Sequence, residues 1–258
     1  MHNQVYRNSA FFPFDESKEV NSLAAGLTFS LNDAPHPLCL LAAGELQLYL
    51  QHQQEWTHNF GLSSDIEGTI IGKMFGVLIV RTKRNELGYL AAFSGKLAGG
   101  NHHAKFVPPI FDGLAEGGFV NAGMTKLTQI NEEISLLESY KNEAYDEEIR
   151  LLKILRKTHS ISLQNKIFEQ YHFLNKASES KSLIEIFEDT PYKKPPAGAG
   201  ECAAPKLLQY AFRHEMEPLA LAEFWWGLSP KSASWKHGHF YNPCQEKCAP
   251  ILTHMLAG

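Results

Sequence analysis

The sequence predicts an α+β fold: a compact body with a small, mostly antiparallel sheet and packed helices, plus a protruding antiparallel helical hairpin. Two apolar, β-branched segments flank a polar turn, which is typical of a β-hairpin. Residues 129–190 contain no glycine or proline and repeat apolar side chains at three- and four-residue spacing, which indicates helices. Near the C-terminus, the apolar segment 219–226 predicts another strand.

Bulk composition limits the class of protein. The chain has 258 residues, of which 44% are hydrophobic, enough for a substantial core in one large domain or two small ones. Its formal net charge of −4 provides no general basic field, so any RNA contact must be local. No apolar run reaches roughly 18 residues, and the N-terminus does not look like a signal peptide. We therefore expect a cytoplasmic protein without a membrane partner, whose four cysteines form no disulfide framework.

The N-terminal half is expected to contain a helix followed by a β-hairpin. Residues 1–40 show weak periodicity and should cover the surface as extended chain. A broad apolar face predicts a helix from Pro37 to about Trp56. The hairpin strands are expected at 68–80 and 87–94. Because an isolated hairpin is only marginally stable, this helix should pack on it.

The charged middle segment predicts an inserted arm. Two long helices should break at Thr158–Ser162, where hydroxyl side chains favour a helix start, and a short third helix, Ser182–Glu188, should lead back to the body. The expected domains are therefore a body formed by residues 1–126 and 191–258, which carries the cysteines, and an inserted helical hairpin at 127–190.

The C-terminal segment 195–248 holds three of the four cysteines. Prolines and glycines at its start should end the preceding helix. A helix is expected at Pro205–His214 and a buried strand at Leu219–Trp226. This strand should join the hairpin sheet, because its backbone groups need hydrogen-bond partners.

The cysteines predict a candidate metal site. Cys244 and Cys248 are four residues apart and would lie on one face of a helical turn. Together with Cys202 and with His237 or His239, of which we favour His239, they would supply four ligands of the kind that tetrahedral zinc prefers. The alternative is a set of reduced cysteines without metal, and the sequence leaves both open.

The order of these cysteines is also similar to that of zinc-dependent nucleobase deaminases, in which one helix carries a ligand and a second begins with Pro-Cys-x-x-Cys. Two features depart from that pattern. Cys244 and Cys248 have one residue too many between them, and Ala204 stands where the proton-carrying glutamate belongs. A deaminase-like enzyme acting on a nucleobase or nucleoside would need Glu201 or Glu223 in that role.

Several segments resemble the long N-terminal region of a subgroup of bacterial RluA-type RNA pseudouridine synthases, and the resemblance covers most of the chain in a consistent order. They include HPLCLLAAGELQLYL (36–50), LGYLAAFSGKLAGGNHH (87–103), FVPPIFD (106–112), PPAGAGECAAPKLLQYAF (195–212) and AEFWWGLSPKS (222–232).

The resemblance implies a role in converting uridine to pseudouridine in tRNA or rRNA. In that family, a following catalytic domain carries an aspartate in an Arg-Leu-Asp motif. This chain contains no such motif, and we expect the catalytic domain beyond Gly258 or on a separate chain. No catalytic residue is therefore carried over, and this chain alone is not expected to be a pseudouridine synthase.

The sequence leaves two functions open: a non-catalytic RNA-positioning module of such a synthase, and the deaminase-like zinc enzyme. RNA binding would combine stacking on aromatic rings with neutralisation of phosphates by basic side chains. The candidate RNA contacts are Lys193, Lys194, Lys206, Arg213, Lys231, Trp235, Lys236, His239 and Tyr241.

Overall fold

The computed structural model describes residues 10–15, 17–31 and 34–258. Within them, an antiparallel five-stranded sheet has the strand order β1-β3-β2-β6-β7, and the predicted α+β fold is confirmed. The strands of this sheet are β1 (Phe11–Pro13), β2 (Lys73–Arg81), β3 (Leu87–Phe93), β6 (Glu217–Trp226) and β7 (Phe240–Tyr241). A separate small hairpin consists of β4 (His172–Leu174) and β5 (Ser180–Ser182). The helices are α1 (Lys18–Ala24), α2 (Pro37–His52), α3 (Phe119–Ser139), α4 (Asp146–Phe168), α5 (Leu183–Glu188), α6 (Ala203–Arg213) and α7 (Ala249–Met255), with a 3₁₀ turn at Glu143–Tyr145.

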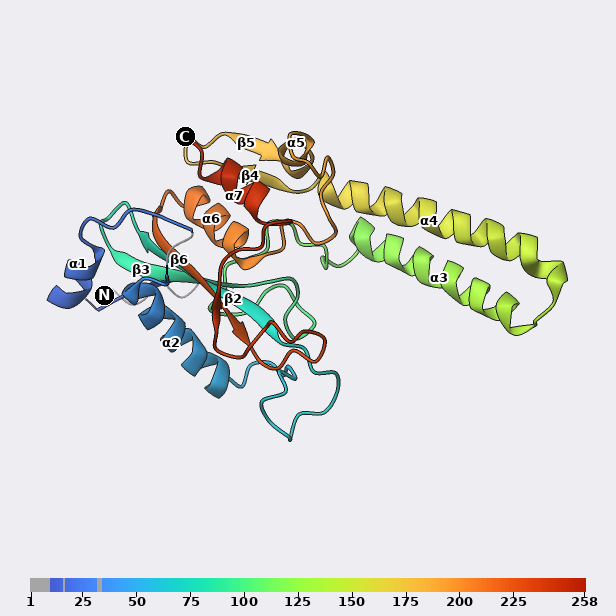
Figure 1. Cartoon of the computed structure of the whole chain (residues 1–258), viewed down its shortest axis with the longest axis horizontal. Helices are drawn as coiled ribbons and strands as arrows, with labels where there is room; N and C mark the ends of the chain where they lie inside the picture. The colour runs from blue at the N-terminus through green and yellow to red at the C-terminus, as the bar shows by residue number, and fades with distance from the viewer. Residues whose placement is uncertain (1–9, 16, 32–33) are drawn as a thin grey trace.

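Helices cover both faces of the large sheet, with α2 on one side and α6 and α7 on the other (Figure 1). Neighbouring residues of β2 point to opposite faces, so that Val77 and Ile79 pack with α2 whereas Leu78 and Val80 pack with α6. This explains why the strand sequence is apolar throughout and does not alternate. As predicted, β6 pairs with the hairpin, and it lies beside β2.

Helix α6 lies unusually close to the sheet at Gly76. A Cβ atom at this glycine would be 3.0 Å from both the Ala203 Cβ and the Leu207 Cδ1. Gly76 therefore provides room for the first turn of α6, because a larger side chain would push the helix outward. This contact fixes the position of Cys202, the residue that precedes the first turn.

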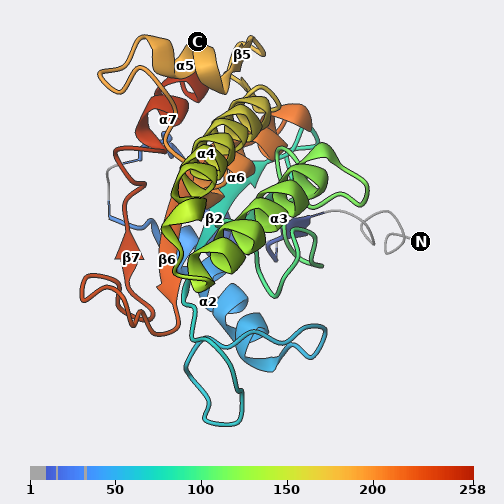
Figure 2. The same cartoon turned by 90° about the vertical axis from the view of Figure 1, so that its right-hand side faces the viewer.

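The antiparallel pair α3 and α4 projects from the body as an arm (Figure 1), and Figure 2 shows the two helices side by side at its front. The predicted break at Thr158–Ser162 is wrong, because α4 is continuous there. The Thr158 hydroxyl donates to the Ile154 carbonyl within the helix, at 3.1 Å. The turn lies instead around Asn142, whose side chain accepts from the Ala144 N–H at 3.0 Å.

The observed boundaries of the arm differ from the predicted ones at both ends. The two helices span 119–168, whereas the expected arm was 127–190. The segment after α4 returns to the body because Phe173, Leu183 and Phe187 are fully buried in the core on the α6 side. Strands β4 and β5 had no clear signal in the sequence, since each has only three residues.

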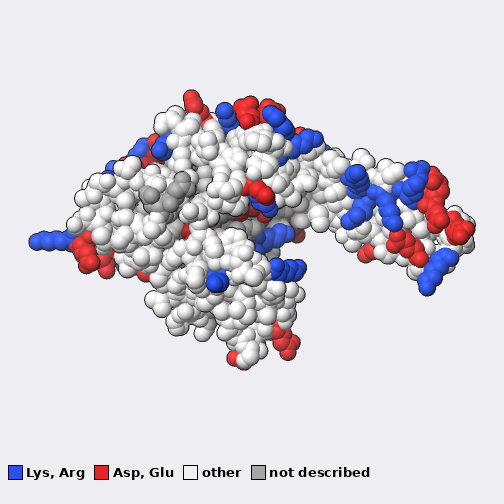
Figure 3. All heavy atoms as spheres, in the orientation of Figure 1, with Lys and Arg blue, Asp and Glu red and all other residues white. Residues whose placement is uncertain are grey.

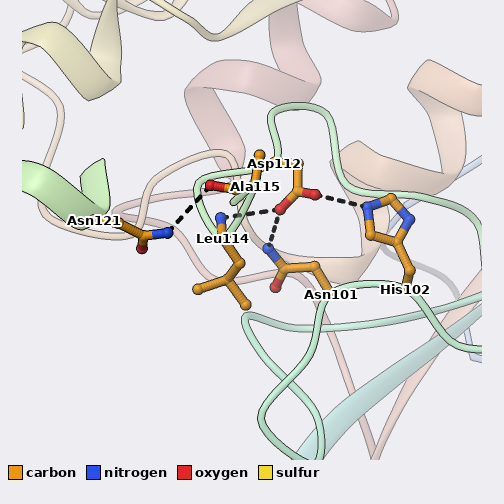
Figure 4. Close-up of polar contacts among 6 residues, drawn as sticks. All are labelled: Asn101, His102, Asp112, Leu114, Ala115 and Asn121. Carbon is orange, nitrogen blue, oxygen red and sulfur yellow. Dashed lines mark hydrogen bonds and ion pairs between the residues drawn. The ribbon is translucent and has the colours of Figure 1, made fainter. Parts of the chain in front are cut away.

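A polar network anchors the base of the arm (Figure 4). The Asp112 carboxylate accepts hydrogen bonds from the Asn101 side chain at 3.1 Å and from the Leu114 N–H at 3.0 Å, and it lies 2.9 Å from the His102 Nε2. Asn121 in the first turn of α3 donates to the Ala115 carbonyl at 3.1 Å. These contacts connect the loop after β3 to the start of the arm.

The N-terminal region contains more secondary structure than expected. Residues 1–9, 16 and 32–33 of the predicted extended segment lie outside the described residues. Within the rest of that segment, β1 pairs with β3, and α1 begins after Ser17, whose side chain accepts from the Val20 N–H. Helix α2 ends at His52, earlier than the predicted Trp56. Among the described residues, no helix combines the length and apolarity needed to cross a membrane.

We predict that Leu207→Ala destabilises the body strongly. Leu207 is fully buried between α6 and the sheet, and truncating such a side chain costs about 2–5 kcal/mol. Urea unfolding would measure the change in the free energy of unfolding. The matched control is Leu136→Ala, because Leu136 is 55% exposed on the arm; equal losses for the two variants would contradict the proposed packing.

Candidate metal centre

Two helix starts bring the cysteines together. Cys202 is the N-cap of α6, and it follows a turn in which Gly198 and Gly200 have positive φ angles. Cys248 is the N-cap of α7, and its N–H donates to the Cys244 carbonyl at 3.2 Å. Since α6 and α7 pack on the same face of the sheet, their first turns meet.

The three sulfur atoms form a compact cluster. The Sγ atoms of Cys202, Cys244 and Cys248 all lie within 4.8 Å of one another, and those of Cys244 and Cys248 are 3.4 Å apart. Sulfur ligands of a tetrahedral zinc ion lie about 3.8 Å apart, since each Zn–S bond is about 2.3 Å long. The predicted convergence of these cysteines is confirmed, and the cluster could hold a metal ion.

The three thiols shift one another's pKa values. Hydrogen bonds from the Cys202 and Cys248 thiols lower the pKa of Cys244 well below its usual value. The same interactions, with burial, raise the pKa values of Cys202 and Cys248. Three thiolates at this spacing would repel one another strongly, and a divalent cation would neutralise that repulsion.

His239 does not belong to the cluster. Its side chain is exposed, and its backbone carbonyl accepts from the Trp225 N–H at 3.0 Å beside the end of β6. Among the described residues, the ligand atoms grouped within 4.8 Å of one another are the three sulfurs alone, so His239 as a fourth ligand stays a prediction. The described cluster contains three protein ligands, which would leave one coordination position of a tetrahedral metal for water or substrate.

A buried carboxylate lies next to the cysteines. Glu223 on β6 is only 4% exposed, and its Oε1 accepts from the Ala204 N–H at 3.1 Å. Burial raises the Glu223 pKa to about 7; the Ala204 hydrogen bond opposes this shift, and the charge of Cys244 adds to it. The deaminase pattern expects a glutamate at position 204, and the Glu223 carboxylate reaches the backbone of that position from the neighbouring strand.

Glu201, the other candidate proton carrier, has a different environment. It is half-buried, and its carboxylate accepts from the Tyr171 hydroxyl at 3.2 Å. Its backbone carbonyl accepts from the Gly95 N–H at 2.9 Å. These contacts hold Glu201 between the small hairpin and the loop after β3, so Glu223 is the better placed of the two glutamates.

A cavity of about 350 Å³ reaches Glu223 from the surface. It lies between the segment that precedes α2 and the β6–β7 edge of the sheet. Its lining residues are Leu31, Ala34, Pro35, Leu221, Ala222, Glu223, Phe240, Tyr241, Asn242 and Pro243. Sequence reasoning missed Asn242 and Phe240, because the cavity exists only where Pro35 and its neighbours pack beside β7.

Part of the predicted RNA-binding set gathers on the loop between β6 and β7 and on β7 itself. The Trp235 ring stacks on Trp225 with centroids 5.4 Å apart and meets the Tyr241 ring edge-on at 4.6 Å. Lys231 and Lys236 on the same loop are exposed, as is His239. We call this group, Lys231, Trp235, Lys236, His239 and Tyr241, the aromatic–basic loop.

The remaining members of the set lie elsewhere. Lys206 is buried, and its Nζ donates to the carbonyls of Phe93 at 3.0 Å and Gly95 at 3.2 Å. Burial lowers its pKa to about 8. The prediction of Lys206 as a phosphate contact is therefore wrong, because its ammonium group is buried and donates hydrogen bonds to backbone carbonyls at the end of β3.

Three further basic residues are exposed but separate from the aromatic–basic loop. Lys193 and Lys194 follow α5, and the Lys193 Nζ donates to the Glu188 carbonyl at 3.1 Å. Arg213 lies at the opposite end of α6 from Cys202. The nine predicted contacts therefore do not form one surface.

We predict that the purified chain binds about one zinc ion and that Cys244→Ser abolishes this binding, because two thiolates retain zinc poorly. Metal analysis of protein expressed without added zinc would measure the ratio. Cys39→Ser is the matched control, since Cys39 is buried in α2 and belongs to the other core. His239→Ala should keep its zinc, and zinc loss in that variant would place the imidazole among the ligands.

The comparisons with known proteins identify no family for this chain. No protein-family model matches it, and neither a curated protein nor a solved structure does. The resemblance to RluA-type synthases therefore stays a prediction, and the chemistry of the site rests on the geometry given above.

Proposed function

We propose that this chain is a zinc-containing, non-catalytic module that positions RNA for an RluA-type pseudouridine synthase. The observation that carries the proposal is the position of the aromatic–basic loop, which leads directly through Asn242 and Pro243 to Cys244 in the sulfur cluster. The aromatic rings of Trp235 and Tyr241 and the ammonium groups of Lys231 and Lys236 thus lie on one short segment. Binding of single-stranded RNA uses both, because bases stack on rings and phosphates pair with basic side chains.

The metal centre would hold this segment in place. A zinc ion bound by Cys202 and Cys244 would join the start of α6 to the chain that leaves β7. Strand β7 contains only Phe240 and Tyr241 and pairs with β6 at the sheet edge, so hydrogen bonding alone anchors it weakly. Metal binding would therefore order the loop for recognition.

The proposal assigns the isomerisation itself to a catalytic domain supplied in cis or in trans. The chain lacks the Arg-Leu-Asp motif that the family uses to attack uridine. Its proposed contribution is affinity and orientation of tRNA or rRNA. Because the net charge is −4, that affinity would come from a local surface and would fall with added salt.

We predict that Trp235→Ala weakens binding to single-stranded RNA by about 1–3 kcal/mol, the contribution typical of a base stacked on an aromatic ring. Replacing Lys231 and Lys236 by alanine should make the salt dependence shallower, by about 0.7 in the log–log slope for each phosphate that is no longer neutralised. Fluorescence anisotropy titrations across salt concentrations would measure both effects. The double variant Lys193→Ala/Lys194→Ala is the control and should bind RNA like the wild type. If Trp235→Ala and the Lys231/Lys236 double variant also bind RNA like the wild type, the proposed surface is wrong.

A second function is favoured by the position of Glu223. Zinc-dependent deaminases place a glutamate beside the metal, where it carries a proton. Here Glu223 interacts with Cys244 and also lines the cavity, whose lining includes Pro243, the residue before Cys244, but none of the three cysteines. The cavity volume of about 350 Å³ is at the lower end of the range for small-molecule sites and would admit a nucleobase.

The reaction would be hydrolytic deamination. A zinc ion at the three cysteines would supply Lewis acidity toward water. Glu223 would take a proton from water and deliver it to the leaving amine, so that the base amine and water give a carbonyl and ammonia. Tyr241 and Phe240 at the cavity wall would orient the base by ring contact.

We predict that, under this second function, Glu223→Gln abolishes release of ammonia from cytidine or adenosine while the zinc content stays unchanged. The amide keeps the shape of the side chain but cannot carry the proton. Glu201→Gln is the matched control and should retain turnover. Turnover that survives Glu223→Gln, or an absence of turnover in the zinc-loaded wild type, would remove this candidate and leave the RNA-positioning role intact.

A further inference from the structure

Two of the three clustered cysteines are positioned to form a disulfide. The Sγ atoms of Cys244 and Cys248 are 3.4 Å apart, and a disulfide bond is about 2.05 Å long, so the sulfurs need to approach each other by about 1.4 Å. The Cys248 N–H donates to the Cys244 carbonyl at 3.2 Å, which holds the two residues on one turn of the chain. Both are free cysteines in the structure.

The two sulfurs differ in their access to solvent. Cys244 is exposed, whereas Cys248 is 2% exposed and packs in the core on the α6 side of the sheet. A dissolved oxidant therefore reaches Cys244 first, and Cys248 is the adjacent protected thiol that can attack the oxidised sulfur. An accessible cysteine beside a second, resolving cysteine is the arrangement found in redox sensors.

The other two cysteines are less suited to this reaction. Cys202 lies within 4.8 Å of the pair, but it is half-buried and is fixed as the N-cap of α6 by the close packing of that helix at Gly76. Cys39 is buried in α2 and belongs to the core on the opposite side of the sheet. The chain before Cys244 is held by the two-residue strand β7, so it can move with its sulfur.

We propose that Cys244 and Cys248 are a peroxide-sensitive pair whose oxidation releases zinc from the candidate metal centre. The Cys244 sulfur attacks one oxygen of hydrogen peroxide, so that an S–O bond forms, the O–O bond breaks, and a sulfenic acid and water result. The Cys248 sulfur then attacks the Cys244 sulfur, so that the S–S bond forms, the S–O bond breaks and a second water leaves. The sulfurs lose two electrons to the peroxide, and the thiol protons leave in the water molecules.

This inference rests on the proposed zinc-containing module, because the switch acts through the metal ligands. A disulfide removes two of the three sulfur ligands, and Cys202 alone retains zinc poorly. When zinc is bound, solvent supplies the two protons and the metal leaves as the free ion. The aromatic–basic loop then loses its connection to α6. Basic side chains are also present on the arm and on the body beneath it (Figure 3), so oxidation should weaken RNA binding several-fold without abolishing it.

Peptide mapping of the full chain after treatment with hydrogen peroxide tests the proposal. Trypsin cleaves after Lys247, between the two cysteines, so the disulfide would link peptide 237–247 to peptide 248–258. Dithiothreitol should remove this link, and Cys39 should stay reduced as the internal control. Cys202→Ser is the matched variant: serine is a good N-cap, so α6 should be retained and the same link should form.

The absence of this link, or a link from either peptide to the one that contains Cys202, overturns the proposal. An irreversible mass increase at Cys244 does the same, because it would show oxidation without a resolving thiol. A zinc-loaded chain that forms the link and keeps its zinc also overturns it. A chain that forms the link but contained no zinc or bound no RNA before oxidation contradicts the proposed function and leaves the disulfide pair intact, so the two failures are distinguishable.

Discussion

The close contact between α6 and the sheet at Gly76 is the constraint on which the candidate site depends. Gly76 pairs with Glu223 across β2 and β6, so the gap left by its missing side chain is adjacent to the buried carboxylate. The first turn of α6 occupies that gap and brings the Ala204 N–H to Glu223 and Cys202 to the other cysteines. One glycine thus sets the distance between a backbone donor, a carboxylate and a thiol.

Two buried ionisable side chains fix the orientation of α6. Glu223 accepts from the start of the helix, and Lys206 donates from one turn later to the end of β3. A buried polar group without a partner is costly, so rotation of α6 would break both sets of contacts. This arrangement makes the helix start rigid, which suits a position that supplies a metal ligand.

The body and the arm use apolar surface differently. The body buries its apolar side chains in two cores on either side of one sheet. The arm buries one face of each helix and leaves Leu151, Ile154 and Ile161 of α4 about half exposed. Asp112 joins the loop after β3 to the segment before α3, and Asn121 of α3 donates to Ala115 in that segment, so the arm is anchored where it leaves the body (Figure 4).

The sequence by itself determined the α+β class, the β2–β3 hairpin, the helical arm and the three cysteines, because periodicity and ligand chemistry are local properties. Only the tertiary structure decided which side chains share the site. Lys206 is basic yet buried, and His239 lies close in sequence to Cys244 yet outside the cluster. Glu223 has no motif spacing, but strand pairing carries it to Ala204. Contacts between distant segments depend on packing and strand register, which no local pattern records.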